Sequence, residues 1–168
     1  MKNSAIPSFE QVIEANKASI YRICEVYAVS PIEPDDLFQE VICHLWRAFP
    51  SFERKAKIST WIYRIALNVC MRYKSKLEKS NENLIRFESI QFQVPSATPD
   101  ISAQEKYYAL HKCIRSLNQK DRAIVILVLD ELPYKEIADI TGLTENHIAV
   151  KMKRMKKVLL KCINSKLR

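Results

Sequence analysis

The chain has 168 residues, a single glycine, 48% apolar residues and a formal net charge of +8. One glycine together with frequent Leu, Ile, Lys and Glu favours an all-α protein, and the positive charge favours a polyanionic partner. No apolar run approaches ~18 residues and no signal peptide is recognisable, which argues against a membrane-spanning helix and predicts a cytoplasmic protein.

The charge is distributed unevenly along the chain. Residues 1–50 hold four basic and seven acidic residues, a net −3, whereas residues 51–80 hold eight basic and two acidic residues, a net +6. From residue 141 onward there are eight basic residues and one acid, a net +7. Two basic segments separated by acidic or neutral sequence predict two contacts with nucleic acid and a separate surface for a protein.

Three helices are predicted in the first half of the chain. Apolar residues at helical spacing predict a helix over 9–29, which two prolines end. Asp35 or Asp36 is expected to cap a second helix, with Gln39 reaching back as in a capping box. A short basic loop then leads into a third helix over 60–77.

The third helix carries a polar side that suits nucleic acid. Arg64, Asn68 and Arg72 follow one another at i, i+4 and i+8, and Trp61 lies at the border with the apolar side. Guanidinium and amide groups beside a lysine-rich loop can hold phosphates, and an indole can stack on an unpaired base. The competing interpretation is that the charges are merely solvated and that Trp61 is a packing residue.

The character of the sequence changes at residue 80. Residues 80–102 contain two prolines, many small polar residues and no sustained period, which predicts a linker between helical domains at 1–79 and 103–168. Within the second domain, the AIVILVL segment at 123–129 fits a buried strand by periodicity alone. No second strand candidate exists to pair with it, so we predict a helix.

Residues 132–162 have the pattern of a helix-turn-helix. Gly142 is expected just past the end of the first helix in the left-handed conformation, and Thr144 is expected to cap the second helix. Near the start of that second helix, Asn146 and Val150 suit base edges, and the lysines beyond them suit phosphates. The competing interpretation is a solvated helix end whose lysines offset the helix dipole.

The five cysteines are odd in number, scattered, and never in CxxC spacing. Each falls within a helical pattern, so we predict reduced, buried or half-buried thiols rather than disulfides or metal ligands. They are Cys24, Cys43, Cys70, Cys113 and Cys162. The three histidines are isolated from one another and from any cysteine cluster, so no metal site and no cofactor are expected.

Three segments together resemble the extracytoplasmic-function sigma factors of bacterial RNA polymerase. They are DDLFQEVICHLWRAFPSF at 35–52, STWIYRIALNVCMRYKSK at 59–76 and LPYKEIADITGLTENHIAVKMKRMKKVL at 132–159. Their order and spacing are similar to the family's region two, linker and region four over nearly the whole chain. Two positions depart from the family's pattern: Thr141 stands where a bulky apolar residue is common, and Lys151 where Arg is usual.

The resemblance implies a protein without enzymatic activity that binds core RNA polymerase and directs promoter-specific initiation. It would read the duplex −35 element, and it would melt the −10 element by capturing an extruded base. Extruding a base costs a few kcal/mol, and a pocket that binds only the unpaired form offsets that cost, so recognition and melting become one step.

The resemblance also implies three sets of contact residues. The core-polymerase set, expected on the clamp helices of the largest subunit, is Asp36, Leu37, Gln39 and Glu40. The −10 set is Lys55, Lys57, Ser59, Thr60, Trp61, Arg64, Asn68 and Arg72. The −35 set is Thr144, Asn146, His147, Val150, Lys151, Lys153, Arg154 and Lys157. The implied partners are promoter DNA, core polymerase including the subunit near the −35 region, and an anti-sigma factor, frequently a membrane protein in this family; no small-molecule substrate is implied.

Three other interpretations compete with a sigma factor. A stand-alone helix-turn-helix regulator would bind duplex DNA as a dimer, commonly on a palindrome, without polymerase. A recombinase would need an activated nucleophile in an α/β domain, and the first half of the chain offers neither strands nor such a group. An adaptor that binds polymerase but not DNA would leave the two basic faces unexplained.

Overall fold

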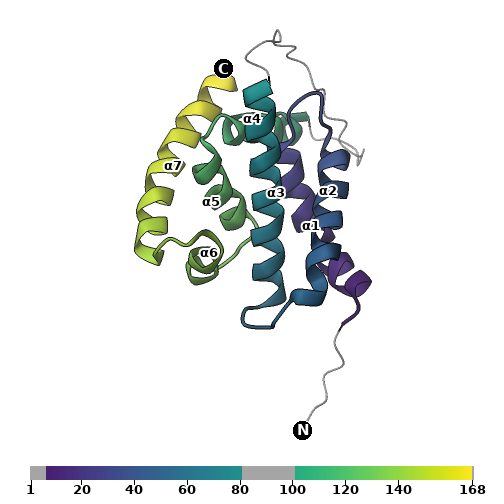
Figure 1. Cartoon of the computed structure of the whole chain (residues 1–168). Helices are drawn as coiled ribbons and strands as arrows, with labels where there is room; N and C mark the ends of the chain where they lie inside the picture. Colours follow the sequence, from purple (N-terminus) through teal and green to yellow (C-terminus); the bar gives the residue numbers. More distant parts are fainter. Residues whose placement is uncertain (1–6, 81–100, 168) are drawn as a thin grey trace. The chain divides into compact units, whose positions relative to one another are not determined.

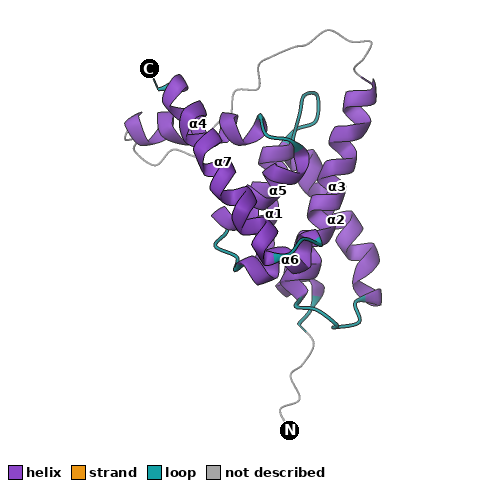
Figure 2. Cartoon of the chain, turned by 90° about the vertical axis from the view of Figure 1, so that its left-hand side faces the viewer, coloured by secondary structure: helices purple, strands orange, loops and turns teal. Residues whose placement is uncertain are grey.

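The computed structural model describes residues 7–80 and 101–167, and every element within these ranges is helical (Figures 1 and 2). The prediction of an all-α protein is therefore confirmed. The helices form two compact units that divide between Leu77 and Glu78. Most of the predicted linker, including its apolar residues between 84 and 94, lies outside the described ranges.

The N-terminal unit consists of three helices and one short 3-10 turn. They are α1 (Phe9–Tyr27), α2 (Pro34–Ala48), η1 (Phe49–Ser51) and α3 (Ile58–Ser80). Each long helix contributes fully buried residues to one core: Ile23 and Cys24 from α1, Val41 from α2, and Ala66 and Cys70 from α3 are all 0% exposed. The core therefore lies between the three helices and leaves one side of each helix to solvent.

The start of α2 differs from the prediction. The helix begins at Pro34, one residue before the predicted caps, and Glu33 is the capping residue. The carboxylate of Asp36 accepts a hydrogen bond from the Glu33 main-chain N–H at 3.2 Å. A proline is favoured at the first helical position because its fixed φ suits the helix and its missing N–H would have no helical partner.

The C-terminal unit contains α4 (Ile101–Arg115), α5 (Gln119–Leu129), α6 (Tyr134–Thr141) and α7 (Glu145–Lys166). Helix α5 packs against each of the other three, and its residues 121–127 are all buried. A helix surrounded in this way needs no polar side, which explains why its sequence lacks helical periodicity. The prediction of a helix rather than a strand for 123–129 is confirmed.

A buried arginine joins α4 to α5. Arg122 is 1% exposed, and its guanidinium donates hydrogen bonds to the main-chain carbonyl oxygens of Arg115 and Leu117. The bond to Leu117 is 2.9 Å long. The last carbonyl groups of a helix have no N–H donor within the helix, and Arg122 supplies one to Arg115 at the end of α4 and another to Leu117 in the connection that follows. These main-chain dipoles in turn solvate the charge of the guanidinium.

The prediction for the cysteines was wrong in part. Cys113 of α4 and Cys162 of α7 form a disulfide, with Cα atoms 6.0 Å apart and a sequence separation of 49. Cys24 and Cys70 are buried thiols, as predicted, but Cys43 is exposed. Helical periodicity places Cys113 and Cys162 on the inner sides of their helices, and only the packing of α4 against α7 brings them within bonding distance.

Candidate nucleic-acid interface

The turn that precedes α7 has the predicted geometry. Gly142 has φ of 73°, in the left-handed region, and its N–H donates to the carbonyl oxygen of Ala138 at 2.8 Å. Thr144 then caps α7, because its hydroxyl oxygen accepts a hydrogen bond from the His147 N–H at 3.2 Å. Both local predictions for the turn are confirmed.

Thr141 has a role in this turn that explains the departure from a bulky apolar residue. Its hydroxyl donates to the carbonyl oxygen of Ile137 at 2.7 Å and accepts from the N–H of Leu143 at 3.4 Å. The same side chain thus bonds main-chain groups on both sides of Gly142. These bonds hold the chain as it passes from α6 to α7.

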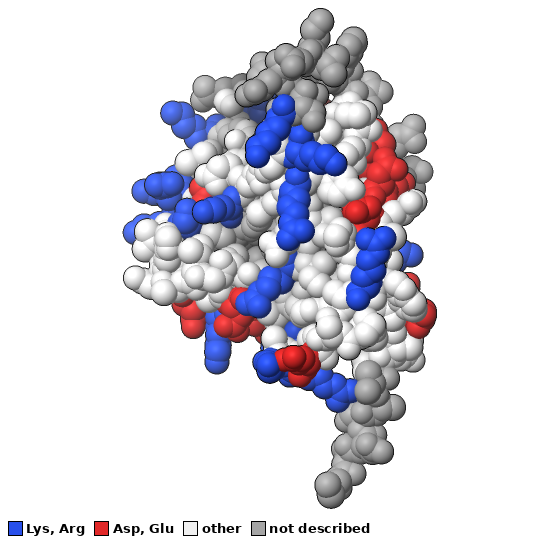
Figure 3. Space-filling model, viewed as in Figure 1, with Lys and Arg blue, Asp and Glu red and all other residues white. Residues whose placement is uncertain are grey.

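Helix α7 separates its apolar and polar residues by face. Its inner side buries Ile148, Met152, Met155 and Leu159, as predicted. Its other side exposes seven of the eight residues expected at −35, including Val150 at 61%. These are Thr144, Asn146, His147, Val150, Lys153, Arg154 and Lys157. In Figure 3, Lys and Arg side chains gather over α7 at the left of the view.

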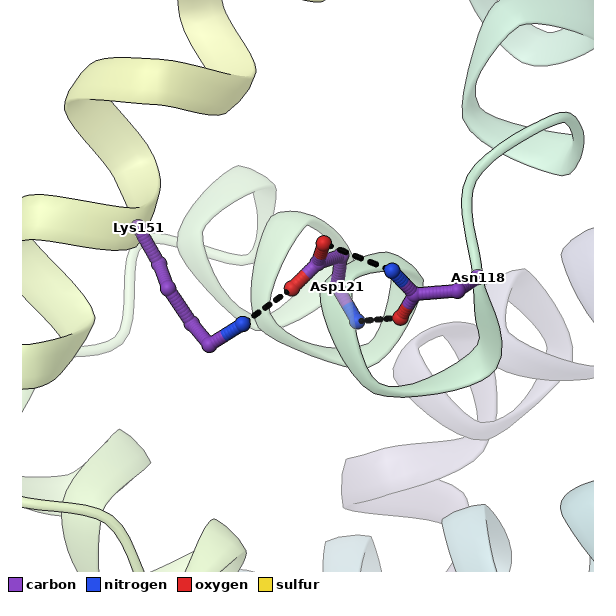
Figure 4. Close-up of polar contacts among 3 residues, drawn as sticks. All are labelled: Asn118, Asp121 and Lys151. Atoms are coloured by element: carbon purple, nitrogen blue, oxygen red, sulfur yellow. Dashed lines mark hydrogen bonds and ion pairs between the residues drawn. The ribbon is translucent and has the colours of Figure 1, made fainter.

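Lys151 is the exception among the residues expected at −35. Its Nζ lies 2.7 Å from Oδ1 of Asp121 on α5, and its side chain is only 23% exposed (Figure 4). Oδ2 of Asp121 accepts a second bond from Nδ2 of Asn118 at 2.8 Å, and Oδ1 of Asn118 accepts from the Asp121 N–H at 2.9 Å. Lys151 therefore lies in a network within the unit, and nothing in the sequence pattern alone indicated Asp121 or Asn118 as members of it.

The electrostatics of this network favour an ionised Asp121. Burial raises the pKa of the carboxyl group, but hydrogen bonds from Lys151 and Asn118 and the charges of Lys151 and Arg154 outweigh it and lower the pKa below its ordinary value. The carboxylate thus remains charged at neutral pH and holds Lys151 by a charge-assisted hydrogen bond.

The predicted polar side of α3 is exposed along its length. Arg64, Asn68 and Arg72 all lie on the surface of the N-terminal unit. Lys and Arg side chains also line the exposed side of α3 in Figure 3. The three side chains share one helical side, which is the arrangement that phosphate and base contacts require.

The loop before α3 exposes its two predicted lysines, whereas the first turn of α3 buries one of the residues predicted there. Lys55 and Lys57 are exposed, and Lys55 forms an ion pair with Glu53. Ser59 is half-buried, whereas Thr60 is only 4% exposed. Because Thr60 belongs to the core side of the first turn of α3, we leave it out of the proposed interface.

Trp61 packs in an aromatic cluster that the sequence did not indicate as a unit. Its ring lies 5.1 Å from that of Phe52 and 6.4 Å from that of Phe49. Phe9 extends the cluster, with ring centroids 5.3 Å from Phe49 and 5.0 Å from Trp46. Trp61 is thus half-buried against neighbours, consistent with the competing interpretation of a packing role, while Trp46 is 59% exposed at the edge of the cluster.

The four residues expected to bind core polymerase differ in accessibility. Asp36 and Gln39 are exposed, but Leu37 is 1% exposed and belongs to the core. Glu40 is half-buried, with Oε1 3.4 Å from Nε2 of His44. Glu40 also interacts with Tyr73 on α3: partial burial of the phenol, together with the charge of Glu40 and a hydrogen bond with it, raises the pKa of Tyr73. The surface of α2 that a partner can reach therefore contains Asp36 and Gln39, with Glu40 at its edge.

Two further properties of the described residues bear on function. Within 7–80 and 101–167, no group of three or more His, Cys, Asp or Glu side chains is placed to hold a metal ion. In the same ranges, none of the helices has the combined length and apolarity needed to cross a membrane.

Comparisons with known proteins match both units. The profile of Sigma-70 region 2 matches residues 12–80, and the profile of Sigma-70, region 4 matches residues 107–159. The ECF RNA polymerase sigma factor SigW of Bacillus subtilis is 24% identical over 164 residues, which cover 92% of this chain and 88% of SigW. The ECF RNA polymerase sigma-E factor of Escherichia coli is 30% identical over 115 residues, or 62% of this chain and 60% of the relative.

A solved structure has the same fold. The complex of the sigma factor RpoE with the anti-sigma factor NepR from Bartonella quintana contains a chain that aligns with a TM-score of 0.73 at 18% identity, covering 93% of this chain and 96% of that chain. The two profiles lie in the order of the two helical units, and their residues include the polar side of α3 and the helix-turn-helix. The chain therefore belongs to the extracytoplasmic-function (ECF) sigma factors.

Proposed function

We propose that this chain binds core RNA polymerase and directs it to promoters by contacting DNA with both of its units. The observation that carries the proposal is the presence of sigma region 2 and sigma region 4 in one chain, each with an exposed basic helix side. A stand-alone regulator needs only the helix-turn-helix, and this interpretation leaves the exposed polar side of α3 without a role.

In the C-terminal unit, α7 would enter the major groove of the −35 element. Asn146 and Val150, on the exposed side near the capped end, would face base edges, since an amide can pair with adenine and an apolar group can contact a thymine methyl. Lys153, Arg154 and Lys157 would bind phosphates and set the register of the helix. Thr144 would hold the helix end and lie close to the backbone of the DNA.

In the N-terminal unit, α3 and its preceding loop would hold the −10 element. Arg64, Asn68 and Arg72 are exposed on one side, with Lys55 and Lys57 in the loop at the start of the helix. Cations of this kind bind the backbone of a separated strand, and an amide can discriminate an extruded base. Because binding is restricted to the unpaired form, the same contacts would promote strand separation.

The exposed part of α2 would bind the clamp helices of the largest polymerase subunit. Asp36 and Gln39 are its accessible members, and the acidic first third of the chain suits a basic partner surface. The chain would act without enzymatic activity of its own, in the cytoplasm where transcription takes place. Because the RpoE relative is solved with an anti-sigma factor, we further propose an anti-sigma partner for this chain.

Run-off transcription tests the proposal directly. Core RNA polymerase is incubated with a library of promoter fragments, with and without the purified chain. Specific transcripts that start only when the chain is present support a sigma factor, and aligning their promoters defines both elements. Binding of duplex DNA without any association with core polymerase would instead support the stand-alone regulator.

Matched variants then test the two DNA surfaces. Arg64→Ala and Asn68→Ala should reduce open complexes on duplex promoters, whereas Lys17→Ala, an exposed cation on α1, should not. Asn146→Ala should change the base preferred at −35 without changing the salt dependence of binding. Normal strand opening by both α3 variants would remove that surface from the proposal.

A further inference from the structure

We propose that Lys151 is a positioning residue that sets the angle of the recognition helix, and that it does not bind a phosphate. The proposal rests on the proposed function of α7 and deepens it. It separates Lys151 from Lys153, Arg154 and Lys157, which lie exposed on the same helix. The observation behind it is the bond from Lys151 to Asp121 on α5, 30 residues earlier in the chain.

The bond belongs to a continuous network that runs from Asn118 through Asp121 to Lys151. Asn118 caps α5 and bonds both the main chain and the side chain of Asp121, so the carboxylate is held in one orientation. Lys151 bonds the other carboxylate oxygen, at 2.7 Å. Figure 4 shows these contacts extending from the start of α5 to α7. The position of α7 at Lys151 is therefore tied to the first turn of α5.

The burial of this pair makes it costly to separate. The side chain of Asp121 is 7% exposed and that of Lys151 is 23% exposed. If Lys151 turned outward to a phosphate, it would leave a buried carboxylate without its main counter-charge, and such a loss outweighs one additional phosphate contact. Arg154 also contributes a favourable charge at Asp121, whereas the side-chain hydrogen bonds to the carboxylate come from Lys151 and Asn118.

The location of Lys151 gives the bond an effect on base reading. It lies one residue beyond Val150 and five beyond Asn146, the two residues proposed to face base edges. An α-helix moves as a rigid element over this length, so a change of tilt at Lys151 shifts both side chains in the groove. Loss of the bond should therefore weaken discrimination between base pairs more than overall attraction to DNA.

The first test measures coupling in the free, full-length chain. Lys151→Met, Asp121→Asn and the double variant are compared by thermal unfolding and by hydrogen exchange of α5 and α7. We expect each single variant to lower the melting temperature of the C-terminal unit and the double variant to lower it little further, because both changes remove one bond. Lys151→Arg should retain most of the stability. Additive effects of the two single changes would overturn the proposal.

The second test measures DNA binding at a temperature where circular dichroism shows every variant folded. The affinity of the full-length chain, in complex with core polymerase, is measured for two duplexes. One is the −35 duplex that the wild-type chain selects from a random library, and the other is a scrambled duplex. We expect Lys151→Met to reduce the preference for the selected duplex by about tenfold, as for one lost base contact. The salt dependence should remain that of the wild type, and Lys151→Arg should restore the preference.

Lys153→Met is the matched control, since Lys153 is exposed on the same helix. This change should weaken binding to both duplexes alike and lower the slope of log K against log salt by about one. The same behaviour from Lys151→Met would identify a phosphate contact and overturn the proposal, as would an unchanged preference. If Lys153→Met also has no effect on DNA, the proposed function of α7 fails, while the coupling of Lys151 to Asp121 is still decided by the unfolding measurements.

Discussion

Replacing Gly142 by alanine tests whether the turn of the helix-turn-helix depends on a left-handed residue. Gly142 has φ of +73°, and a Cβ built at this position meets no atom within 4 Å. The substitution therefore carries no packing penalty, and its effect comes from the backbone alone. The change in the free energy of unfolding can therefore be worked out from backbone preferences.

The magnitude follows from two opposing contributions. The left-handed conformation costs a residue with a Cβ about 1–2 kcal/mol. Alanine also restricts the unfolded chain relative to glycine, which favours the folded state by about 0.4–1 kcal/mol. The net loss for Gly142→Ala is about 1 kcal/mol, which corresponds to about 4–8 °C in the melting temperature of a unit of this size. Gly142→Asn should lose less, since asparagine tolerates this conformation better.

Both units can be followed separately in the same sample. The two tryptophans, Trp46 and Trp61, lie in the N-terminal unit, so their fluorescence during urea unfolding serves as an internal control. Hydrogen exchange of peptides from α6 and α7 reports the C-terminal unit. We expect Gly142→Ala to destabilise only the latter, with Gly142→Asn between it and the wild type. Equal stability of Gly142→Ala and the wild type would refute the argument that this turn requires a left-handed residue.

The remaining predictions concern the disulfide and the Asp121 network. Replacing Cys113 and Cys162 together by alanine should lower the stability of the C-terminal unit by about 2–4 kcal/mol, because the bridge closes a long loop; Cys43→Ala, at an exposed thiol, is the control and should have little effect in the same urea titration. Asp121 should make the C-terminal unit sensitive to acid. Folding lowers the pKa of Asp121 below its ordinary value of 3.8. The stability that Asp121 contributes is therefore present above pH 3.8 and is lost as the pH falls through the lower pKa of the folded state. Urea midpoints of the wild type and Asp121→Asn, compared between about pH 2 and 6, should converge at the acid end; parallel curves would show that this carboxylate is not linked to folding.

The sequence alone determined the features that depend on local interactions. Gly142 and Thr144 were assigned their conformations correctly because a left-handed turn and a helix cap involve neighbouring residues only. The inner side of α7 also followed from spacing, since residues three and four apart necessarily share a face. The helical state of 123–129 required one additional argument, the absence of a partner strand.

The tertiary structure decided which elements meet and how accessible each side chain is. The Cys113–Cys162 bridge and the Lys151–Asp121 bond join helices that are distant in sequence, and periodicity places a residue on a side of its helix without identifying the opposite helix. Family resemblance likewise selected Leu37 and Thr60 as contact residues, although both are buried. A motif is matched along the chain, whereas a contact surface consists of the atoms that remain exposed after the helices have packed.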